Sequence, residues 1–431
     1  MTPRTRRQSS PSTPAATGVA RRHRPDYQII LFMGILVLLG LIVLYAISPA
    51  RVELINQNGG SSLDQAHFMQ KQLLYLGIGL AGFGFAATMT PEWWKRYTSK
   101  ILLAGFAACF VLLILGLIPG NPLVINTGGA TRWFNVGVGS FQPAELLKFG
   151  LLLYVAAFLG RRMQQGKVNS VNDTLVPVGI MVGLASLFII VFQKDMGTGL
   201  TMVGMVLAML VIAGLKARLF ALVAGVGVGA GLLLIVTSPH RIARVLTFLN
   251  PSGTDVESYH ITQATIAMGS GGLFGRGLGQ GVSPFGYLPE AVNDSIFAVL
   301  GETFGFVGLI VILLLFFMLL RRLLFIVDRI DDPTMRLIVA GVFGLIMTHV
   351  VVNVGAMTGV FPLTGVTLPF LSFGGTSLLF MMLGLGLVFH ISRYTSHRTI
   401  DDVKETGDEG SVRRRRVGRT RNAGTRRHQR A

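Results

Sequence analysis

Charged residues are scarce in this sequence. Asp, Glu, Lys and Arg make up 13% of its 431 residues, whereas 51% of the residues are hydrophobic and the mean hydropathy is +0.60. A soluble domain usually carries about 25% charged residues. The shortage argues against an ordinary soluble protein and indicates that lipid is the main solvent of the chain.

Several chemical signatures are missing as well. Cys109 is the only cysteine, which excludes an internal disulfide and a cysteine-based metal site. The eight histidines are scattered without a zinc motif, and His349, inside an apolar segment, is expected to make interhelical hydrogen bonds. The glycine-rich string at residues 269–281 matches neither a dinucleotide fingerprint nor a Walker A loop. We predict no organic cofactor.

The hydrophobic residues form ten separate segments. Each has roughly 17–25 residues, the length that a helix needs to cross a hydrocarbon core of about 30 Å. The segments lie near residues 27–48, 72–89, 101–118, 144–160, 174–192, 198–214, 219–237, 296–320, 337–358 and 377–392. The sequence thus predicts an all-α polytopic membrane protein with about ten transmembrane helices in residues 27–393. Residues 238–295 form a large extracytoplasmic loop between the seventh and eighth helices.

The distribution of the 38 basic residues predicts the orientation. Residues 1–26 contain six Arg, and residues 393–431 contain twelve Arg or Lys. With a cytoplasmic N-terminus, 30 basic residues lie inside and about six outside, in accord with the positive-inside rule. Both termini are therefore expected in the cytoplasm, as disordered basic tails at 1–26 and 394–431. The tails could instead form a patch for nucleic acid or anionic lipid, but no aromatic residues interleave the charges, and we predict no nucleic-acid partner.

Four long polar segments then face outward, at 49–71, 119–143, 238–295 and 359–376. Loops of this length are usually functional or disordered. Apolar stretches at 241–249 and 261–268 are expected to be amphipathic or re-entrant pieces on the membrane surface. We therefore predict that the chemistry lies at the outer face.

Ionisable residues at membrane depth are costly and mark functional sites. Pro143 suits the first turn of a helix, which would put Glu145 and Lys148 on one face. This pair, together with Arg132, indicates either a buried ion pair that holds two helices together or a polar cavity open to the outside.

Two further clusters interrupt apolar segments. Lys194 and Asp195 occupy a short turn with two glycines, and turn chemistry alone could explain that pattern. Residues 353–377 contain two prolines, several hydroxyls and a Gly-Gly pair. Non-helical backbone at this depth needs a protein-lined or watery cavity, so we expect a broken helix that lines a groove.

The long outward segment carries a row of carboxylates. A helix can start after Pro289, which would place Glu290 and Asp294 four positions apart and Glu302 two turns further on nearly the same face. Such a row suits catalysis, although each carboxylate could instead pair with Lys or Arg. The glycine-rich string before it could offer backbone amides to a diphosphate or could be a flexible loop.

Six strings in this order resemble the SEDS family, which contains FtsW, RodA and SpoVE. They are GGATRWFNVGVGSFQPAELLKF (128–149), QKDMGTG (193–199), RVLTFLNP (244–251), MGSGGLFGRGLGQG (268–281), LPEAVNDSIFAVLGETFGFVG (288–308) and NVGAMTGVFPLTGVTLPFLSFGGTS (353–377). Together they span most of residues 27–393.

The resemblance implies a ten-helix fold with a cavity open to the outer leaflet of the bacterial cytoplasmic membrane. It also implies an enzyme, a peptidoglycan glycosyltransferase that polymerises lipid II on an undecaprenyl-diphosphate-linked glycan. The family's essential Asp falls on Asp294, its cavity Glu and Lys on Glu145 and Lys148, and its membrane-embedded Glu on Glu302.

A positioned carboxylate can take a proton from an attacking sugar hydroxyl, so Asp294 is predicted to be catalytic. The diphosphate leaving group needs positive charge, which basic side chains could supply, with Mg²⁺ or another divalent cation as a cofactor. The predicted substrate-binding residues are Arg132, Glu145, Lys148, Lys194, Arg241, Arg244, Glu290, Glu302 and Ser372.

This sequence departs from the family pattern around the proposed base. The usual His-Thr-Asp-Phe reads Val292-Asn293-Asp294-Ser295, and the usual Glu-Glu reads Glu302-Thr303. A flippase for lipid-linked precursors and a non-catalytic scaffold are the competing interpretations. Because the tails are long, the cell-division branch is favoured over the elongation branch. The resemblance also implies a class B penicillin-binding transpeptidase and other divisome proteins as partners.

Overall fold

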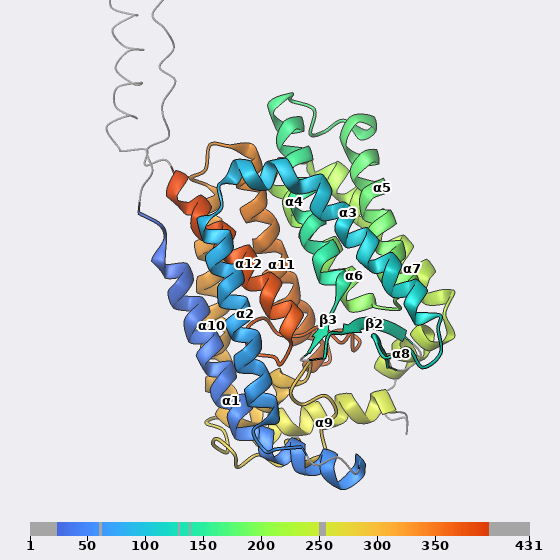
Figure 1. Ribbon diagram of the computed structural model, residues 1–431, viewed down its shortest axis with the longest axis vertical. Helices are drawn as coiled ribbons and strands as arrows, with labels where there is room; N and C mark the ends of the chain where they lie inside the picture. The colour runs from blue at the N-terminus through green and yellow to red at the C-terminus, as the bar shows by residue number, and fades with distance from the viewer. Residues whose placement is uncertain (1–23, 60–62, 128–129, 138, 250–255, 396–431) are drawn as a thin grey trace, which may run out of the picture.

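The protein is a bundle of long helices with a small sheet at its side (Figure 1). The computed structural model describes residues 24–59, 63–127, 130–137, 139–249 and 256–395. Nearly all of both predicted tails lies outside these ranges. The α-helices are α1 (Tyr27–Gly59), α2 (His67–Thr88), α3 (Pro91–Gly116), α4 (Pro143–Gln164), α5 (Val176–Ser186), α6 (Met196–Ile212), α7 (Ala217–Val236), α8 (Pro239–Leu249), α9 (Val256–Ser270), α10 (Ile296–Val327), α11 (Pro333–Met357) and α12 (Gly375–Ile391).

Short helical pieces of other types flank some of these helices. The π-helical turns η1 (Val171–Leu175) and η2 (Leu187–Phe192) extend α5 at both ends, and the 3₁₀ turns are η3 (Ser283–Phe285) and η4 (Ser392–Tyr394). Each of the ten predicted apolar segments falls on a helix. Within the described residues, eight helices are long and apolar enough to cross a membrane, and α6, with 17 residues, is a shorter apolar helix. The prediction of a polytopic, mainly helical membrane protein is confirmed.

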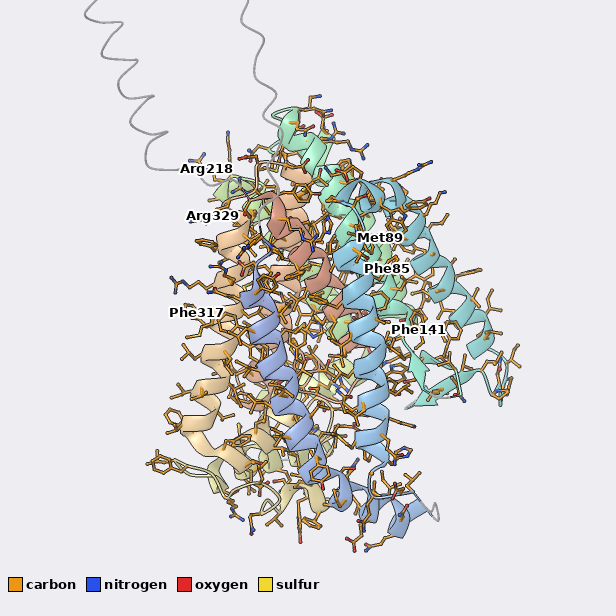
Figure 2. All side chains as sticks on the ribbon, turned by 60° about the vertical axis from the view of Figure 1, so that its left-hand side comes forward. Phe85, Met89, Phe141, Arg218, Phe317 and Arg329 are labelled. Carbon is orange, nitrogen blue, oxygen red and sulfur yellow. The ribbon has the colours of Figure 1, made fainter. Side chains whose placement is uncertain are left out.

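The outside of the bundle is apolar, as a lipid-facing surface requires. Phe317 on α10 points away from the bundle in Figure 2 and is 60% exposed. Arg218 and Arg329, which come from two different predicted cytoplasmic loops, lie at the same end of the bundle (Figure 2). The sheet, α8 and α9 lie toward the other end (Figure 1). The arginines of two predicted cytoplasmic loops and the predicted outward elements therefore lie toward opposite ends of the bundle.

Glycines let several helices approach closely. A Cβ added at Gly105 of α3 would stand 2.6 Å from Cα of Leu147 on α4, and one at Gly150 of α4 would stand 2.8 Å from Cα of Leu102 on α3. Small residues at such crossings replace the hydrophobic driving force that lipid removes. The crossing brings the start of α4, which carries Glu145 and Lys148, into the core.

Three short strands were not foreseen from the sequence. β1 (Val124–Thr127), β2 (Ala130–Asn135) and β3 (Ser140–Phe141) form an antiparallel sheet in the order β1-β2-β3. The sheet is tied to the start of α12, because the hydroxyl of Thr376 donates to the Ser140 carbonyl at 3.1 Å and accepts from the Gln142 amide at 3.2 Å. The described residues of segment 119–143 thus form a small sheet beside the bundle.

Helix α10 is broken at Gly305, where φ is +69°. The glycine-rich string fills the break: the amides of Arg276 and Gly277 donate to the carbonyls of Glu302 and Thr303, at 2.9 and 3.0 Å. On the far side of the break, the amides of residues 306 and 307 donate to the carbonyls of residues 272 and 273, at 2.9 and 3.1 Å. The glycine-rich string therefore packs against the break in α10 and satisfies its backbone groups. This structural role accounts for glycines in the string, and a diphosphate is not needed to explain them.

We predict that Gly105→Val lowers the stability of the folded protein by about 1–3 kcal/mol, because a larger side chain overpacks the crossing of α3 with α4. The measurement is the midpoint of thermal unfolding in detergent. Gly84→Ala in α2 is the matched control, since nothing lies within 4 Å of a Cβ there, and it should leave the midpoint unchanged or raise it. Equal midpoints for the two variants would show that the crossing tolerates added volume.

Candidate functional site

Asp294 lies in a turn that immediately precedes α10. The prediction of a helix from Pro289 was wrong, since residues 289–295 form turns and the helix begins at Ile296. Glu290 has φ of +49°, a left-handed conformation that an α-helix excludes. The Ser295 hydroxyl closes the turn by donating to the Pro289 carbonyl at 2.8 Å. Glu290 and Asp294 are therefore neighbours in a turn, and they do not form a row on one helix face.

The carboxyl group of Asp294 is largely withdrawn from water. Its Oδ1 is buried and has no hydrogen-bond partner within the part of the chain that the structure describes. Its Oδ2 stands 3.9 Å from the place that a Cβ at Gly365 would occupy. Burial raises the pKa of Asp294 to about 7, and the negative charge of Glu290 adds to the shift. The backbone amides of residues 294 and 295 and the charge of Arg244 act in the opposite direction and lower this pKa in part.

The turn is fastened to the non-helical segment between α11 and α12. Asn353 of α11 donates from Nδ2 to the carbonyls of Asp294 and Val366, both at 2.7 Å. The amide of Phe373 donates to the Val292 carbonyl at 2.8 Å. The expected interruption at 359–376 is confirmed, because no helix covers residues 358–374. This segment forms one wall of the Asp294 site.

Glu145 and Lys148 form a buried ion pair at the start of α4. Lys148 Nζ lies 2.7 Å from Glu145 Oε1, and the two side chains are 1% and 4% exposed. Lys148 Nζ also lies 3.2 Å from His349 Nε2, while His349 Nδ1 lies 3.1 Å from the Thr367 carbonyl. A carbonyl only accepts, so Nδ1 carries the proton and Nε2 accepts from Lys148. The ion-pair interpretation is confirmed, and so is the interhelical role predicted for His349.

Two of the predicted cationic residues hold backbone carbonyls. Arg132 of β2 donates to the carbonyls of Gln193 and Lys194, at 3.1 and 2.7 Å. Arg241 of α8 donates to the carbonyls of Leu234 and Ile190, at 2.9 and 2.6 Å. These bonds occupy part of each guanidinium, which has five N–H groups. Both residues thereby join the sheet and α8 to the helix ends beside them.

The turn at residues 193–199 has the local chemistry that the sequence suggested. The Asp195 carboxylate caps α6 by accepting from the Thr198 amide at 2.9 Å, and it also accepts from Gln142 Nε2 at 2.9 Å. Lys194 sits in the turn with φ of +53°. The turn interpretation is confirmed for Asp195.

Glu302 and Ser372 serve the backbone around the site. The Glu302 carboxylate accepts from the amides of Val282 and Ser283, at 2.8 and 3.3 Å, and lines a cavity of about 280 Å³ between α1 and the loop 279–285. Its expected alignment below Asp294 was wrong, because Asp294 precedes the helix and Glu302 turns toward that loop. Ser372 Oγ accepts from the Leu368 amide at 2.8 Å.

Sequence reasoning assigned no role to two residues of the site, although both lie in segments that it singled out. Asn353 is 1% exposed and touches Asp294 directly, and an amide inside an apolar helix was the signal available for it. His260 of α9 lies 2.6 Å from Ser295 Oγ, a contact that only the tertiary fold creates. Among the described residues, no group of three or more His, Cys, Asp or Glu could hold a metal ion. The site therefore contains a carboxyl group, Asp294, with a pKa of about 7 and one oxygen without a hydrogen-bond partner among the described residues. The positive charge of Arg244 is close enough to lower that pKa in part.

Similar proteins are known in sequence and in structure. Stage V sporulation protein E of Bacillus subtilis is 36% identical over 379 residues, 88% of this chain and 99% of that protein. A probable peptidoglycan glycosyltransferase FtsW of Coxiella burnetii is 34% identical over 337 residues, 77% of this chain and 88% of that protein. The crystal structure of the rod shape determining protein RodA from Thermus thermophilus covers 86% of this chain and 98% of its own, with a TM-score of 0.61 and 26% identity.

A chain in a peptidoglycan synthase complex, studied for how it coordinates polymerization and crosslinking, gives a TM-score of 0.63 at 26% identity and covers 86% of this chain and 98% of its own. Residues 27–397 match the family described as "Cell cycle protein" and named for FtsW, RodA and SpoVE. This match contains all of α1 to α12, so the chain belongs to the FtsW/RodA/SpoVE family.

Proposed function

We propose that this protein is a peptidoglycan glycosyltransferase that polymerises lipid II into glycan strands at the outer face of the bacterial cytoplasmic membrane. Relatives that share about a third of its sequence are named probable peptidoglycan glycosyltransferases. The observation that carries the proposal is the Asp294 carboxyl, with a pKa of about 7 and an oxygen that no described residue engages. A base poised near the working pH is the kind that proton removal from a hydroxyl requires.

The reaction is a substitution at an anomeric carbon. The 4-hydroxyl oxygen of the acceptor GlcNAc attacks C1 of the sugar that undecaprenyl diphosphate holds. As the O4–C1 bond forms, the O4–H proton passes to Asp294. The bond from C1 to the diphosphate oxygen breaks, and its electron pair leaves with the diphosphate. The protonated Asp294 then returns its proton to water, which restores the base.

The negative charge of the leaving diphosphate must be balanced. Arg244 lies near enough to Asp294 to influence its charge. The turn that carries Lys194 leads into α6, where a Cβ at Gly197 would collide with the Thr364 carbonyl oxygen in the segment beside Asp294. Arg132 binds that turn, and Arg241 lies on the same helix as Arg244. Mg²⁺ is commonly bound by one or two carboxylates together with substrate phosphates. In the part of the chain that the structure describes, no group of three or more His, Cys, Asp or Glu could hold such an ion. A divalent cation would therefore be held mainly by the substrate phosphates, whose charge it would balance, and Asp294 would stay available as the base.

The names of the relatives support a role in cell division. Proteins named FtsW and stage V sporulation protein E are 34% and 36% identical to this chain, whereas RodA of known structure is 26% identical. We place the protein in the division branch on that basis. The peptidoglycan synthase complex of similar fold supports a class B penicillin-binding transpeptidase as partner. The excess of basic residues in both tails and in one set of loops supports cytoplasmic termini.

Asp294→Asn should lower lipid II polymerisation by at least about 100-fold, because the amide keeps the shape of the side chain and cannot accept the proton. The measurement is glycan-strand formation by purified protein with its transpeptidase partner. Glu92→Gln is the control, since Glu92 is an exposed carboxylate in the first turn of α3, and it should stay within about twofold of the wild type.

Equal polymer from Asp294→Asn and the wild type would remove Asp294 as the base. Lipid II translocation without polymer, measured in vesicles with the same wild-type protein, would replace the polymerase with a flippase.

The wild-type rate should rise with pH through about 7. Asp294 accepts a proton only when ionised, and its raised pKa keeps it protonated at pH values where an ordinary Asp is already ionised. A raised pKa in the folded state also means that the contribution of Asp294 to stability is greatest at acid pH and declines as the pH approaches 7. The measurement is kcat/KM against pH. Glu92→Gln should keep this acid limb, and the residual activity of Asp294→Asn should lack it. A flat wild-type profile across neutral pH would contradict the assignment.

A further inference from the structure

Helix α11 carries two polar side chains one turn apart that face the same non-helical segment. His349 and Asn353 are separated by four residues and therefore share a face. His349 donates from Nδ1 to the Thr367 carbonyl at 3.1 Å, and Asn353 donates from Nδ2 to the carbonyl of the preceding residue, Val366, at 2.7 Å. One face of α11 thus holds two consecutive carbonyls of the segment.

Whereas the other contact of His349 is with Lys148, Asn353 also bonds to the turn that contains Asp294. Its amide nitrogen has two N–H groups, and the second one donates to the main-chain carbonyl of Asp294 at 2.7 Å. The two carbonyls can only accept, so the orientation of the amide is fixed by its partners. The side chain is 1% exposed. One buried group therefore clamps two stretches of backbone that lack helical hydrogen bonds of their own.

We propose that Asn353 is a positioning residue for glycosyl transfer: it fixes the main chain of Asp294 against the segment 358–374 and so aims the carboxyl into the site. The inference rests on the proposed function, because it assigns Asn353 a role in that same reaction. Asn353 does not touch the reacting atoms. It acts through Asp294.

The clamp determines what surrounds the carboxyl. Val366 is adjacent to Gly365, and Gly365 has φ of +72° and leaves open the space next to Asp294 Oδ2. Loss of the bond to Val366 would release that glycine, and loss of the bond to Asp294 would release the turn itself. A displacement of about 1 Å in a reacting group can cost about 100-fold in rate.

The clamp is continuous with the buried ion pair. Lys148 Nζ contacts His349, which holds Thr367, and Asn353 holds Val366 next to it. The pair on α4 is thus connected through α11 to the backbone of Asp294. The buried ion pair therefore helps to hold the segment 358–374 beside Asp294, through the contact of Lys148 with His349.

The test compares three variants in the complete protein with its transpeptidase partner. Asn353→Ala should lower kcat by about 30- to 100-fold and change KM by less than about threefold, because the substrate contacts remain. Asn353→Ser keeps one donor and should give an intermediate kcat. Asn169→Ala is the matched control: Asn169 also bridges two backbone groups, the Gly214 carbonyl at 3.3 Å and the Lys216 amide at 2.7 Å, but it lies in loops remote from Asp294.

A second readout separates positioning from mere folding. In Asn353→Ala, water gains access to Asp294, so the acid limb of the pH–rate profile should move to lower pH. The charged and titratable groups that face Asp294 are Glu290 on its own turn, Arg244 on α8 and, next to Ser295, His260 on α9. None of them is altered by the substitution. A loss of folded protein would lower the amount of product and leave the limb in place.

An infrared titration makes the result independent of turnover. The carboxyl band that disappears in Asp294→Asn belongs to Asp294, and its titration midpoint should fall in Asn353→Ala and stay unchanged in Asn169→Ala. An unchanged midpoint and kcat in Asn353→Ala would overturn the positioning role. If the wild type formed no polymer while the midpoint still moved, the proposed function would fail and the clamp on Asp294 would stand.

Discussion

Every hydrogen bond that a helix loses inside a membrane must be made again within the protein, because lipid offers no partner. This chain interrupts α10 at Gly305 and has no helix across residues 358–374, and the second of these interruptions borders Asp294. At the first break, the glycine-rich string supplies backbone amides and carbonyls. At the second, Asn353 and His349 supply side-chain donors. These groups satisfy part of the irregular backbone at the two interruptions.

The same constraint explains how polar residues divide their work. Glu302, Ser372 and Asp195 spend their side-chain oxygens on backbone amides, and Arg132 and Arg241 spend much of their guanidinium groups on carbonyls. Asp294 differs, since its Oδ1 accepts no hydrogen bond from any described residue. A buried oxygen without a partner is unfavourable for folding. This unpartnered oxygen, together with the raised pKa of the carboxyl, is the observation on which we propose Asp294 as the base.

Much of this could be predicted from the sequence where the signal is local. The ten apolar segments predicted the positions of the long helices. The ion pair of Glu145 with Lys148 was predictable because residues three apart in a helix share a face. The turn at 289–295 could not be predicted, since a left-handed conformation is uncommon for a residue such as Glu290. The contact of Ser295 with His260 exists only in the tertiary fold. The sheet was missed because its strands have 4, 6 and 2 residues, too few for an alternating pattern to be distinctive. Asn353 was visible as an isolated amide, but its partners are 59 and 13 residues away in the chain.

The altered residues around Asp294 are consistent with an intact site. Val292 meets the segment 358–374 through its carbonyl, which accepts from the Phe373 amide, and any residue can offer a carbonyl. Asn293 donates to the carboxylate of Glu290, and Ser295 binds the Pro289 carbonyl and His260. These three positions therefore build the turn from within, and the side chain that projects from it toward Gly365 is Asp294. Different neighbours can hold the same carboxyl in place provided that the turn keeps its shape. Here Ser295 binds the Pro289 carbonyl at the start of the turn, and Asn353 binds the Asp294 carbonyl near its end.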